Sequence, residues 1–256
     1  MKKILRFLQY LYTFYALLWF ILLMLLVLPF TLFFSIFGKI RGGNYVYTIC
    51  NWWGWIWYGL IGVRHREIYE KPHNRQQQFI FVANHISYMD IPAVVRSVHQ
   101  PVRVLGKREM VRYPVFGWIY RMAVILVDRS DTEKRAQSVR ALKAALQKHI
   151  SIFIFPEGTF NETGKPLKEF YSGAFRIAIE TGTPIKPLLF LDTHARLNYR
   201  GLFELTPGPS RVVYLEEIPV TSYGMEDVAR LKQLVHDRME KALVYYQGTP
   251  RSAELE

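Results

Sequence analysis

The sequence of 256 residues contains very little cysteine and, over its first 63 residues, no acidic side chain at all. Cys50 is the only cysteine, so an intrachain disulfide is impossible and a disulfide-stapled secreted fold is excluded. Cys50 lies in an aromatic, apolar stretch without a neighbouring base, which is typical of a buried, inert thiol. The sequence also lacks a P-loop and a Gly-x-Gly-x-x-Gly motif, and Ser87 has no Gly-x-Ser-x-Gly elbow around it. These absences argue against nucleotide binding and against a serine hydrolase.

The charge is strongly positive, with a formal net value of +12. A basic chain can bind nucleic acid, anionic lipid headgroups or a phosphorylated substrate. No nucleic-acid motif accompanies the charge, whereas a long apolar N-terminus does, and the first acid is Glu67. Each Lys or Arg near an anionic membrane surface contributes roughly 1 kcal/mol of attraction. The charge therefore favours a membrane partner and no nucleic acid.

Residues 1–63 are expected to anchor the chain in a membrane. The uncharged run begins at Phe7, and its 22 residues before Pro29 would span about 33 Å as a helix, enough for a hydrocarbon core of roughly 30 Å. A second apolar stretch, residues 45–63, contains four tryptophans, which prefer the headgroup boundary. Basic residues flank both stretches, and the positive-inside rule would place all of them on the cytoplasmic side. A helical hairpin in the cytoplasmic leaflet satisfies this rule and is favoured over one span, with two spans as the third alternative.

Residues 64–248 are predicted to form an α/β domain, followed by a polar tail at residues 249–256. Short β-rich runs alternate with segments of helical periodicity, which indicates a central sheet with helices on its faces. The predicted strands are residues 79–83, 102–105, 124–127, 152–155, 185–191 and 212–215. The predicted helices are residues 91–98, 114–122, 132–149, 173–181 and 225–246.

The first candidate site is Asn84-His-Ile-Ser-Tyr-Met-Asp90. His85 and Asp90 would point apart on one helix or one strand, so they can meet only if the chain turns between them. The strand ending at Ala83 and the helix start at Asp90-Ile-Pro92 supply such a turn. Asp90 would then accept the Nδ1–H of His85, which leaves Nε2 free to act as a general base.

The second candidate site is Phe155-Pro-Glu-Gly-Thr159, which closes the predicted strand at residues 152–155. If the strands are parallel, this turn lies at the same sheet edge as His85, where ligand sites gather. Glu157 could bind hydroxyl groups there, and the backbone N–H groups of the turn could bind an anion.

Together these motifs resemble the glycerolipid acyltransferase family, that of the lysophosphatidate acyltransferases. Its four blocks occur here in order over roughly residues 79–190. They are the His-x4-Asp of residues 84–90, the run from Gly106-Lys-Arg-Glu-Met110 through Pro114-Val-Phe-Gly117 to Val127-Asp-Arg129, then Phe155-Pro-Glu-Gly-Thr159, and Thr183-Pro-Ile-Lys-Pro187. The resemblance implies a central mixed sheet flanked by helices, with an N-terminal membrane-embedded hairpin, at the cytoplasmic face of the inner or plasma membrane.

The resemblance also implies the reaction: acyl transfer from acyl-CoA or an acyl carrier protein onto the hydroxyl of 1-acyl-glycerol-3-phosphate, without a bound cofactor or metal. His85 would be the general base and Asp90 its orienting carboxylate. Backbone N–H groups near Gly106 and Lys107 would be oxyanion donors. The substrate-binding residues implied are Lys107, Arg129, Glu157, Gly158 and Thr159. Membrane lipids, the lysolipid acceptor and the thioester donor are then the expected partners.

Two departures from the family pattern concern the acceptor. Phe160 and Asn161 stand where family members commonly have Arg-Ser, and Tyr171 replaces the lysine of a Phe-Lys-x-Gly pattern. Two cations expected near an acceptor phosphate are therefore missing, although Lys165 or Lys168 could compensate. A lyso-aminolipid acceptor stays open for this reason. A lysolipid hydrolase and a non-catalytic lipid-binding membrane protein are the remaining alternatives.

Overall fold

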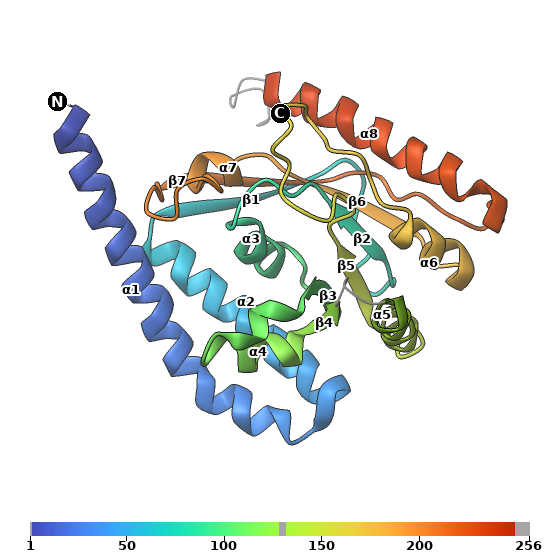
Figure 1. Ribbon diagram of the computed structural model, residues 1–256, viewed down its shortest axis with the longest axis horizontal. Coiled ribbons are helices and arrows are strands. Elements are labelled where there is room, and N and C mark those ends of the chain that lie inside the picture. Colours follow the sequence, from blue (N-terminus) through green and yellow to red (C-terminus); the bar gives the residue numbers. More distant parts are fainter. Residues whose placement is uncertain (1, 128–131, 249–256) are drawn as a thin grey trace.

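The computed structural model describes residues 2–127 and 132–248 of the chain. Figure 1 shows an N-terminal pair of long helices along one side of the molecule and a twisted sheet with helices on both of its faces. The two parts are in direct contact, because the second long helix packs against helices of the sheet domain.

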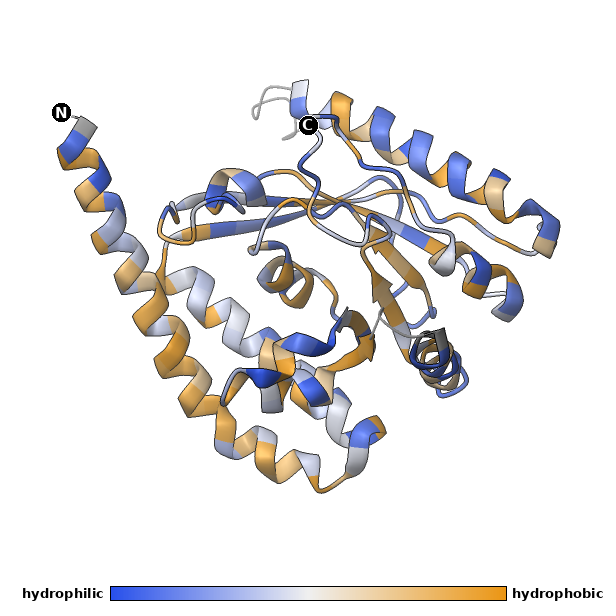
Figure 2. Ribbon diagram, in the orientation of Figure 1, coloured by the Kyte–Doolittle hydropathy of each residue, from blue (hydrophilic) through white to orange (hydrophobic). Residues whose placement is uncertain are grey.

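The N-terminal pair is an antiparallel hairpin of α1 (Lys2–Ser35) and α2 (Gly43–Leu60), joined by the short helix η1 (Gly38–Gly42). The Tyr12 hydroxyl donates to the Ile61 carbonyl, and the Trp57 indole donates to the Ala16 carbonyl at 2.9 Å. α1 continues through Pro29 and exposes many large apolar side chains. Figure 2 shows hydrophobic residues along most of its length. Among the described residues, α1 is the one helix whose length and composition suit a membrane span.

The sheet has seven strands in the order β1-β7-β6-β2-β5-β3-β4. The pairs from β6 through β2, β5 and β3 to β4 are all parallel, whereas β7 is antiparallel to β6. The sheet is therefore mixed, and its parallel part gathers the ends of five strands at one edge. The strands are β1 (Val63–Tyr69), β2 (Ile80–Ala83), β3 (Val102–Lys107), β4 (Val124–Val127), β5 (Ser151–Ile154), β6 (Ile185–Phe190) and β7 (Gly208–Tyr214).

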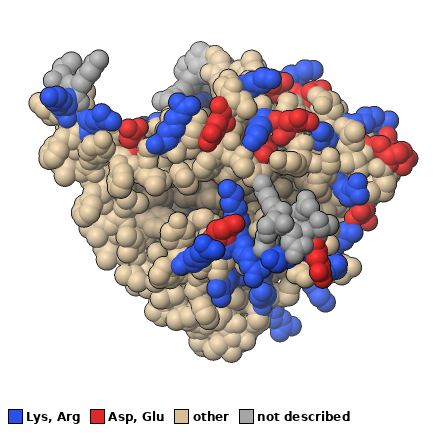
Figure 3. Space-filling model, in the orientation of Figure 1, with Lys and Arg blue, Asp and Glu red and all other residues tan. Residues whose placement is uncertain are grey.

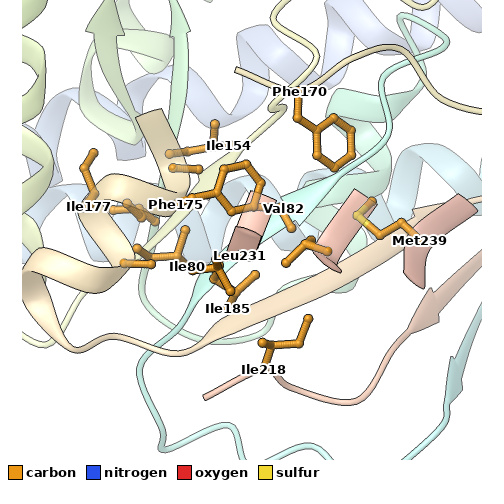
Figure 4. Close-up of a cluster of buried hydrophobic side chains, with 14 of the residues drawn as sticks. Ile80, Val82, Ile154, Phe170, Phe175, Ile177, Ile185, Ile218, Leu231 and Met239 are labelled. Carbon is orange, nitrogen blue, oxygen red and sulfur yellow. The ribbon is translucent and has the colours of Figure 1, made fainter. Parts of the chain in front are cut away.

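Helices cover both faces of the sheet because the central strands are apolar on both sides. Ile80 and Val82 of β2 pack into the core under α5, α6 and α8, while Phe81 packs into a second core with α3. Figure 4 shows Phe175 of α6 among the isoleucines of the first core. The remaining helices are α3 (Asp90–Ser97), η2 (Arg108–Arg112), α4 (Phe116–Ala123), α5 (Thr132–Leu146), α6 (Gly173–Thr181), α7 (Thr193–Arg196), η3 (Met225–Asp227) and α8 (Val228–Gly248).

The predicted strands and helices are all present, with ends that differ by up to four residues, as at β7 and α5. β1 was not predicted, because Arg64 and Arg66 interrupt its apolar pattern, and it is recognisable only by its pairing with β7. Short α7 was also missed. The predicted helix at residues 114–122 begins at Phe116 instead, and the predicted last helix begins with the separate turn η3.

Candidate active site

The turn between β2 and α3 brings His85 and Asp90 together. The Nδ1 atom of His85 lies 2.8 Å from the Asp90 carboxylate oxygen Oδ2. The same oxygen accepts the backbone N–H groups of Ile86 and Ser87, at 2.7 and 2.8 Å. Asp90 is the first residue of α3 and is completely buried. Three donors on one oxygen fix the position of this carboxylate, which is the partner for the Nδ1–H of His85.

The His85 ring lies against aromatic side chains. It stacks on Phe155 with ring centroids 4.1 Å apart, and Phe160 contacts it at 4.4 Å. The His85 side chain is 17% exposed, and its Nε2 atom forms no hydrogen bond with any described residue. The ring is therefore held from two sides while one nitrogen stays available to a substrate.

Glu157 braces the turn rather than facing solvent. Its Oε1 accepts the backbone N–H of His85 at 2.8 Å, and its Oε2 accepts that of Lys168 at 3.0 Å. Glu157 is fully buried, and burial raises its pKa to about 7, with the nearby Asp90 carboxylate raising it further and the two backbone hydrogen bonds lowering it. Both carboxylate oxygens are thus occupied by the backbone, so Glu157 is placed to position His85.

Gly158 and Thr159 continue the same turn. Gly158 has φ +75°, a left-handed conformation that glycine adopts without strain, and its N–H donates to the Phe155 carbonyl at 3.0 Å. The exposed Thr159 hydroxyl accepts a hydrogen bond from Lys168 Nζ at 2.6 Å. Lys168 therefore joins the site from the following loop, where it lies beside Thr159.

Asn84 and Ser87, to which the sequence analysis gives no role in the site, fix the turn around His85 by hydrogen bonds to neighbouring backbone. The Asn84 amide pairs with the backbone of Phe190 in β6, donating at 3.0 Å and accepting at 2.8 Å. The buried Ser87 hydroxyl donates to the Leu197 carbonyl and accepts the N–H of Met89 at 3.0 Å. Their position on either side of His85 was the available signal, because polar residues beside an apolar strand need buried partners.

An aromatic wall stands where the family pattern has a cation. Phe160 contacts Tyr88 edge-on at 4.9 Å and stacks near Tyr199 at 6.1 Å. The next residue, Asn161, donates its N–H to the His85 carbonyl at 2.7 Å, which ties this loop to the base. Tyr171, the second departure, is an exposed side chain whose backbone N–H donates to the Pro156 carbonyl. Neither departure is compensated by a cation in contact with the His85 ring among the described residues.

The remaining predicted site residues lie farther along the sheet edge. Gly106 and Lys107 are in β3, in register with Leu126 and Val127 of β4, and β5 separates β3 from β2. At the usual strand spacing, their backbone stands roughly 10 Å across the sheet from β2. Lys107 is exposed at the carboxyl end of β3. Arg129 lies outside the described residues. Within the described residues, no group of three or more His, Cys, Asp or Glu side chains is arranged to hold a metal ion.

Comparisons with known proteins identify the family that this chain resembles. A family model described as Acyltransferase matches residues 64–191, half of the chain. The chain is 28% identical over 209 residues to the 1-acyl-sn-glycerol-3-phosphate acyltransferase of Haemophilus influenzae, covering 81% of this chain and 85% of that protein. It is 30% identical over 237 residues to the Limnanthes douglasii protein of the same name, covering 90% and 76%.

A solved structure has the same fold. The crystal structure of the 1-acyl-sn-glycerophosphate (LPA) acyltransferase, PlsC, from Thermotoga maritima superposes with a TM-score of 0.74. The match covers 98% of this chain and 99% of that one, at 21% sequence identity. The likeness extends over the N-terminal hairpin as well as the sheet domain.

Proposed function

Because this chain belongs to the acyltransferase family, we propose that it transfers an acyl group from a thioester to the free hydroxyl of 1-acyl-sn-glycerol-3-phosphate, giving phosphatidate. The names of the Haemophilus influenzae and Limnanthes douglasii relatives support this acceptor. Acyl-CoA and an acyl carrier protein are the two proposed donors, and neither the base nor its partner requires a metal or a bound cofactor.

The observation that carries the mechanism is the 2.8 Å contact between His85 Nδ1 and Asp90 Oδ2, with Nε2 free of any described partner. His85 Nε2 takes the proton of the acceptor hydroxyl as its oxygen attacks the thioester carbonyl. Asp90 stabilises the imidazolium that forms. The tetrahedral intermediate collapses, the carbon–sulfur bond breaks, and the leaving thiolate takes the proton from His85. No acyl-enzyme forms, because the nucleophile belongs to the substrate.

Glu157 has a positioning role in this proposal. Its two hydrogen bonds join the backbone of His85 to that of Lys168, so the base and the loop that carries Thr159 move together. Gly158, Thr159, Lys107 and Arg129 are proposed to bind the acceptor. Lys168 is added to them because its ammonium lies beside the Thr159 hydroxyl.

The aromatic wall supports a second acceptor. Phe160 contacts the His85 ring in the position where the family pattern has an arginine, so the surface next to His85 is apolar there. A lysolipid without a phosphate at that position, such as a lyso-aminolipid, loses no ion pair there. The same reaction on such an acceptor is the alternative that this contact favours.

The hairpin is proposed to hold the enzyme on a membrane. Residues 1–63 would form the anchor and residues 64–248 the catalytic domain, with the polar tail at 249–256 outside the described residues. The exposed apolar side chains of α1 and the exposed Trp52 and Trp55 of α2 support an interfacial position. The basic residues at both ends of the hairpin support the cytoplasmic face.

The test is acyl transfer by purified His85→Ala protein in detergent, with labelled acyl-CoA or acyl carrier protein and a panel of lysolipids. The expected result is a fall in kcat of about 10²–10⁴-fold with membrane binding intact. His149→Asn is the matched control, because His149 is exposed and follows α5, before β5 begins, whereas His85 follows the end of β2. Wild-type activity in His85→Ala would refute the mechanism. If the wild-type protein turned over a phosphate-free lysolipid faster than 1-acyl-sn-glycerol-3-phosphate, that lysolipid would become the proposed acceptor.

A further inference from the structure

A cavity of about 1450 Å³ lies beyond β5 from His85, beside β3 and β4. Its walls come from β4, α4, α5, η2 and the hairpin turn η1. Figure 3 shows Lys and Arg side chains gathered over the region of α4 and β3, beside a hollow in the surface. His85 does not line this cavity, and none of the proposed steps uses it except through Lys107 at its edge.

The cavity is strongly basic. Seven basic side chains line it, against the single acid Glu109. Arg108, Arg112 and Arg121 are exposed, and none of the three pairs with an acid among the described residues. Crowded like charges without partners raise the local potential and attract an anion. Arginine is well suited to this role, because its planar guanidinium binds phosphate through two parallel hydrogen bonds.

The same cavity has an apolar floor. The four residues of β4, Val124 to Val127, are half-buried, and Ala141 and Ala144 of α5 leave open space beside them. The volume exceeds the roughly 300–1,000 Å³ of pockets for drug-sized ligands. A basic rim over an apolar floor of this size fits a long ligand that is anionic in one part and uncharged in another.

One wall of the cavity is firmly built. The Arg103 guanidinium is buried, and it donates to the carbonyl oxygens of Lys39 and Ile40 at 2.7 and 3.0 Å. These bonds hold the hairpin turn η1 against β3. Burial lowers the pKa of Arg103 to about 10, so this guanidinium stays charged at neutral pH while it donates to the two carbonyls of the turn.

The distance between the cavity and His85 decides which of the two substrates, acceptor or donor, the cavity can bind. β4 is three strands from β2, roughly 14 Å across the sheet at the usual spacing. The phosphate of a glycerol-3-phosphate acceptor is only a few bonds from the hydroxyl that His85 must reach, so it cannot lie that far away. In a thioester donor the phosphate is at the opposite end of the pantetheine arm from the reacting carbonyl. The cavity therefore matches the donor.

We propose that this cavity binds the phosphate-bearing pantetheine arm of the acyl donor, with Arg108, Arg112 and Arg121 as the phosphate ligands and the apolar floor under the arm. This inference rests on the proposed acyl transfer. Acyl-CoA and acyl carrier protein share the phosphopantetheine group, so both donors fit the chemistry and the experiment separates them.

The test is donor kinetics on the triple variant Arg108→Gln, Arg112→Gln, Arg121→Gln. Loss of the charge-assisted contacts is expected to raise KM for the donor at least about tenfold, with KM for the acceptor unchanged. Wild-type protein should use acyl-phosphopantetheine with a KM about tenfold below that of acyl-pantetheine, and the variant should lose this preference. Arg176→Gln is the control, because Arg176 is an exposed arginine on α6, outside the cavity. An arginine effect with both donors supports the site, and the donor with the higher kcat/KM is then the preferred one. If the effect is present only with acyl carrier protein and is absent with acyl-phosphopantetheine, the arginines recognise the carrier protein and the inference is wrong.

A binding measurement keeps this inference separate from the proposed reaction. Trp118 lines the cavity and is 45% exposed, so its fluorescence should change on titration with 4′-phosphopantetheine, and the change should disappear in Trp118→Phe and in the triple variant. Binding without acyl transfer to any lysolipid would refute the reaction and keep the site. A rise in the acceptor KM alone, or equal binding of pantetheine and phosphopantetheine, would overturn the inference.

Discussion

Two neighbouring regions of one sheet edge have opposite character. At the ends of β2 and β5, His85 is enclosed by Phe155 and Phe160 above two buried carboxylates. At the ends of β3 and β4, exposed arginines surround a wide cavity with one acid. The same parallel topology underlies both regions, so the difference lies in the side chains gathered around each pair of strand ends, including Arg121 of α4, which precedes β4.

The contrast has an electrostatic reason. His85 becomes positively charged when it takes the hydroxyl proton, and a cation at about 4 Å would oppose this by about 4 kcal/mol at an effective dielectric constant of 20. Aromatic neighbours do not oppose it. Anion binding needs the reverse, a group of cations open to solvent. Separating the two regions by a strand or more lets each chemistry proceed without weakening the other.

Removing the Asp90 carboxylate, the partner of His85, should have the largest effect on the rate of acyl transfer. Asp90→Asn replaces the acceptor for Nδ1–H by a group that cannot stabilise an imidazolium. We expect kcat to fall about 10²–10⁴-fold, measured by acyl transfer at saturating substrate. The unfolding temperature is the control, since the amide oxygen can still accept the backbone N–H groups of Ile86 and Ser87. Unchanged kcat with an intact fold would contradict the role of Asp90.

Glu157→Gln should have an intermediate effect. The glutamine oxygen can accept one of the two backbone N–H groups, but its NH₂ group would face the other. A buried N–H left unpaired costs about 1–3 kcal/mol of stability, and displacement of His85 should lower kcat about 10–100-fold. Denaturant unfolding and steady-state rates measure the two effects. A loss of stability without any loss of kcat would mean that Glu157 does not position the base.

Because the pKa of Glu157 is raised, the difference in stability between the wild-type protein and Glu157→Gln should depend on pH. Between its ordinary value of 4.5 and about 7, the folded protein binds a proton on Glu157 that the unfolded chain does not. The free energy of unfolding therefore falls as pH rises through this window, by about 3 kcal/mol relative to Glu157→Gln. Unfolding curves of both proteins from pH 4.5 to 7.5 measure the difference. Parallel curves would show that Glu157 has an ordinary pKa.

Phe160→Arg would place a cation beside His85 and so remove the difference in charge between the surroundings of His85 and the basic cavity. We expect KM for 1-acyl-sn-glycerol-3-phosphate to fall about tenfold through a new phosphate contact, while kcat falls because the imidazolium is opposed. Phe160→Leu is the control that removes the ring without adding charge. Rates on phosphate-bearing and phosphate-free lysolipids measure the change in preference, and an unchanged ratio would remove Phe160 from acceptor recognition.

Thr159→Val should have the smallest effect. The exposed Thr159 hydroxyl accepts a hydrogen bond from the Lys168 ammonium, and solvent can replace that bond. We expect kcat/KM to fall no more than about threefold. A loss of tenfold or more, concentrated in KM for the acceptor, would mean instead that the hydroxyl itself binds the acceptor.

Much of the architecture was predictable because the central strands carry strong local patterns. β2 is a continuous apolar run, β5 and β6 are apolar apart from Ser151, Lys186 and Pro187, and α8 repeats its apolar residues at helical spacing. β1 was not predictable in the same way, since Arg64 and Arg66 interrupt its apolar pattern and only pairing with β7 stabilises it as a strand. The contact between His85 and Asp90 was predictable because a strand end and a helix start enclose it within six residues.

The contacts of Glu157 and Phe160 were not predictable from their neighbours in sequence. Glu157 was expected to bind hydroxyl groups, but it meets the N–H of His85, 72 residues earlier in the chain. Phe160 stood out only as a missing cation, whereas in the folded protein its ring lies on the base. The basic cavity likewise joins residues from the hairpin turn, α4 and α5, which no local pattern connects.

The sequence by itself determined which groups are available for chemistry: the His-x4-Asp turn, the Pro-Glu-Gly turn, the apolar N-terminus and the excess of basic residues. These depend on residue type and local spacing, which the chain carries before it folds. Only the tertiary structure decided which of these groups lie in contact and which lie far apart. Parallel pairing placed β5 between His85 and the arginines, and packing brought the buried Glu157 carboxylate onto the backbone N–H of His85. Distance and burial arise only when remote segments pack together.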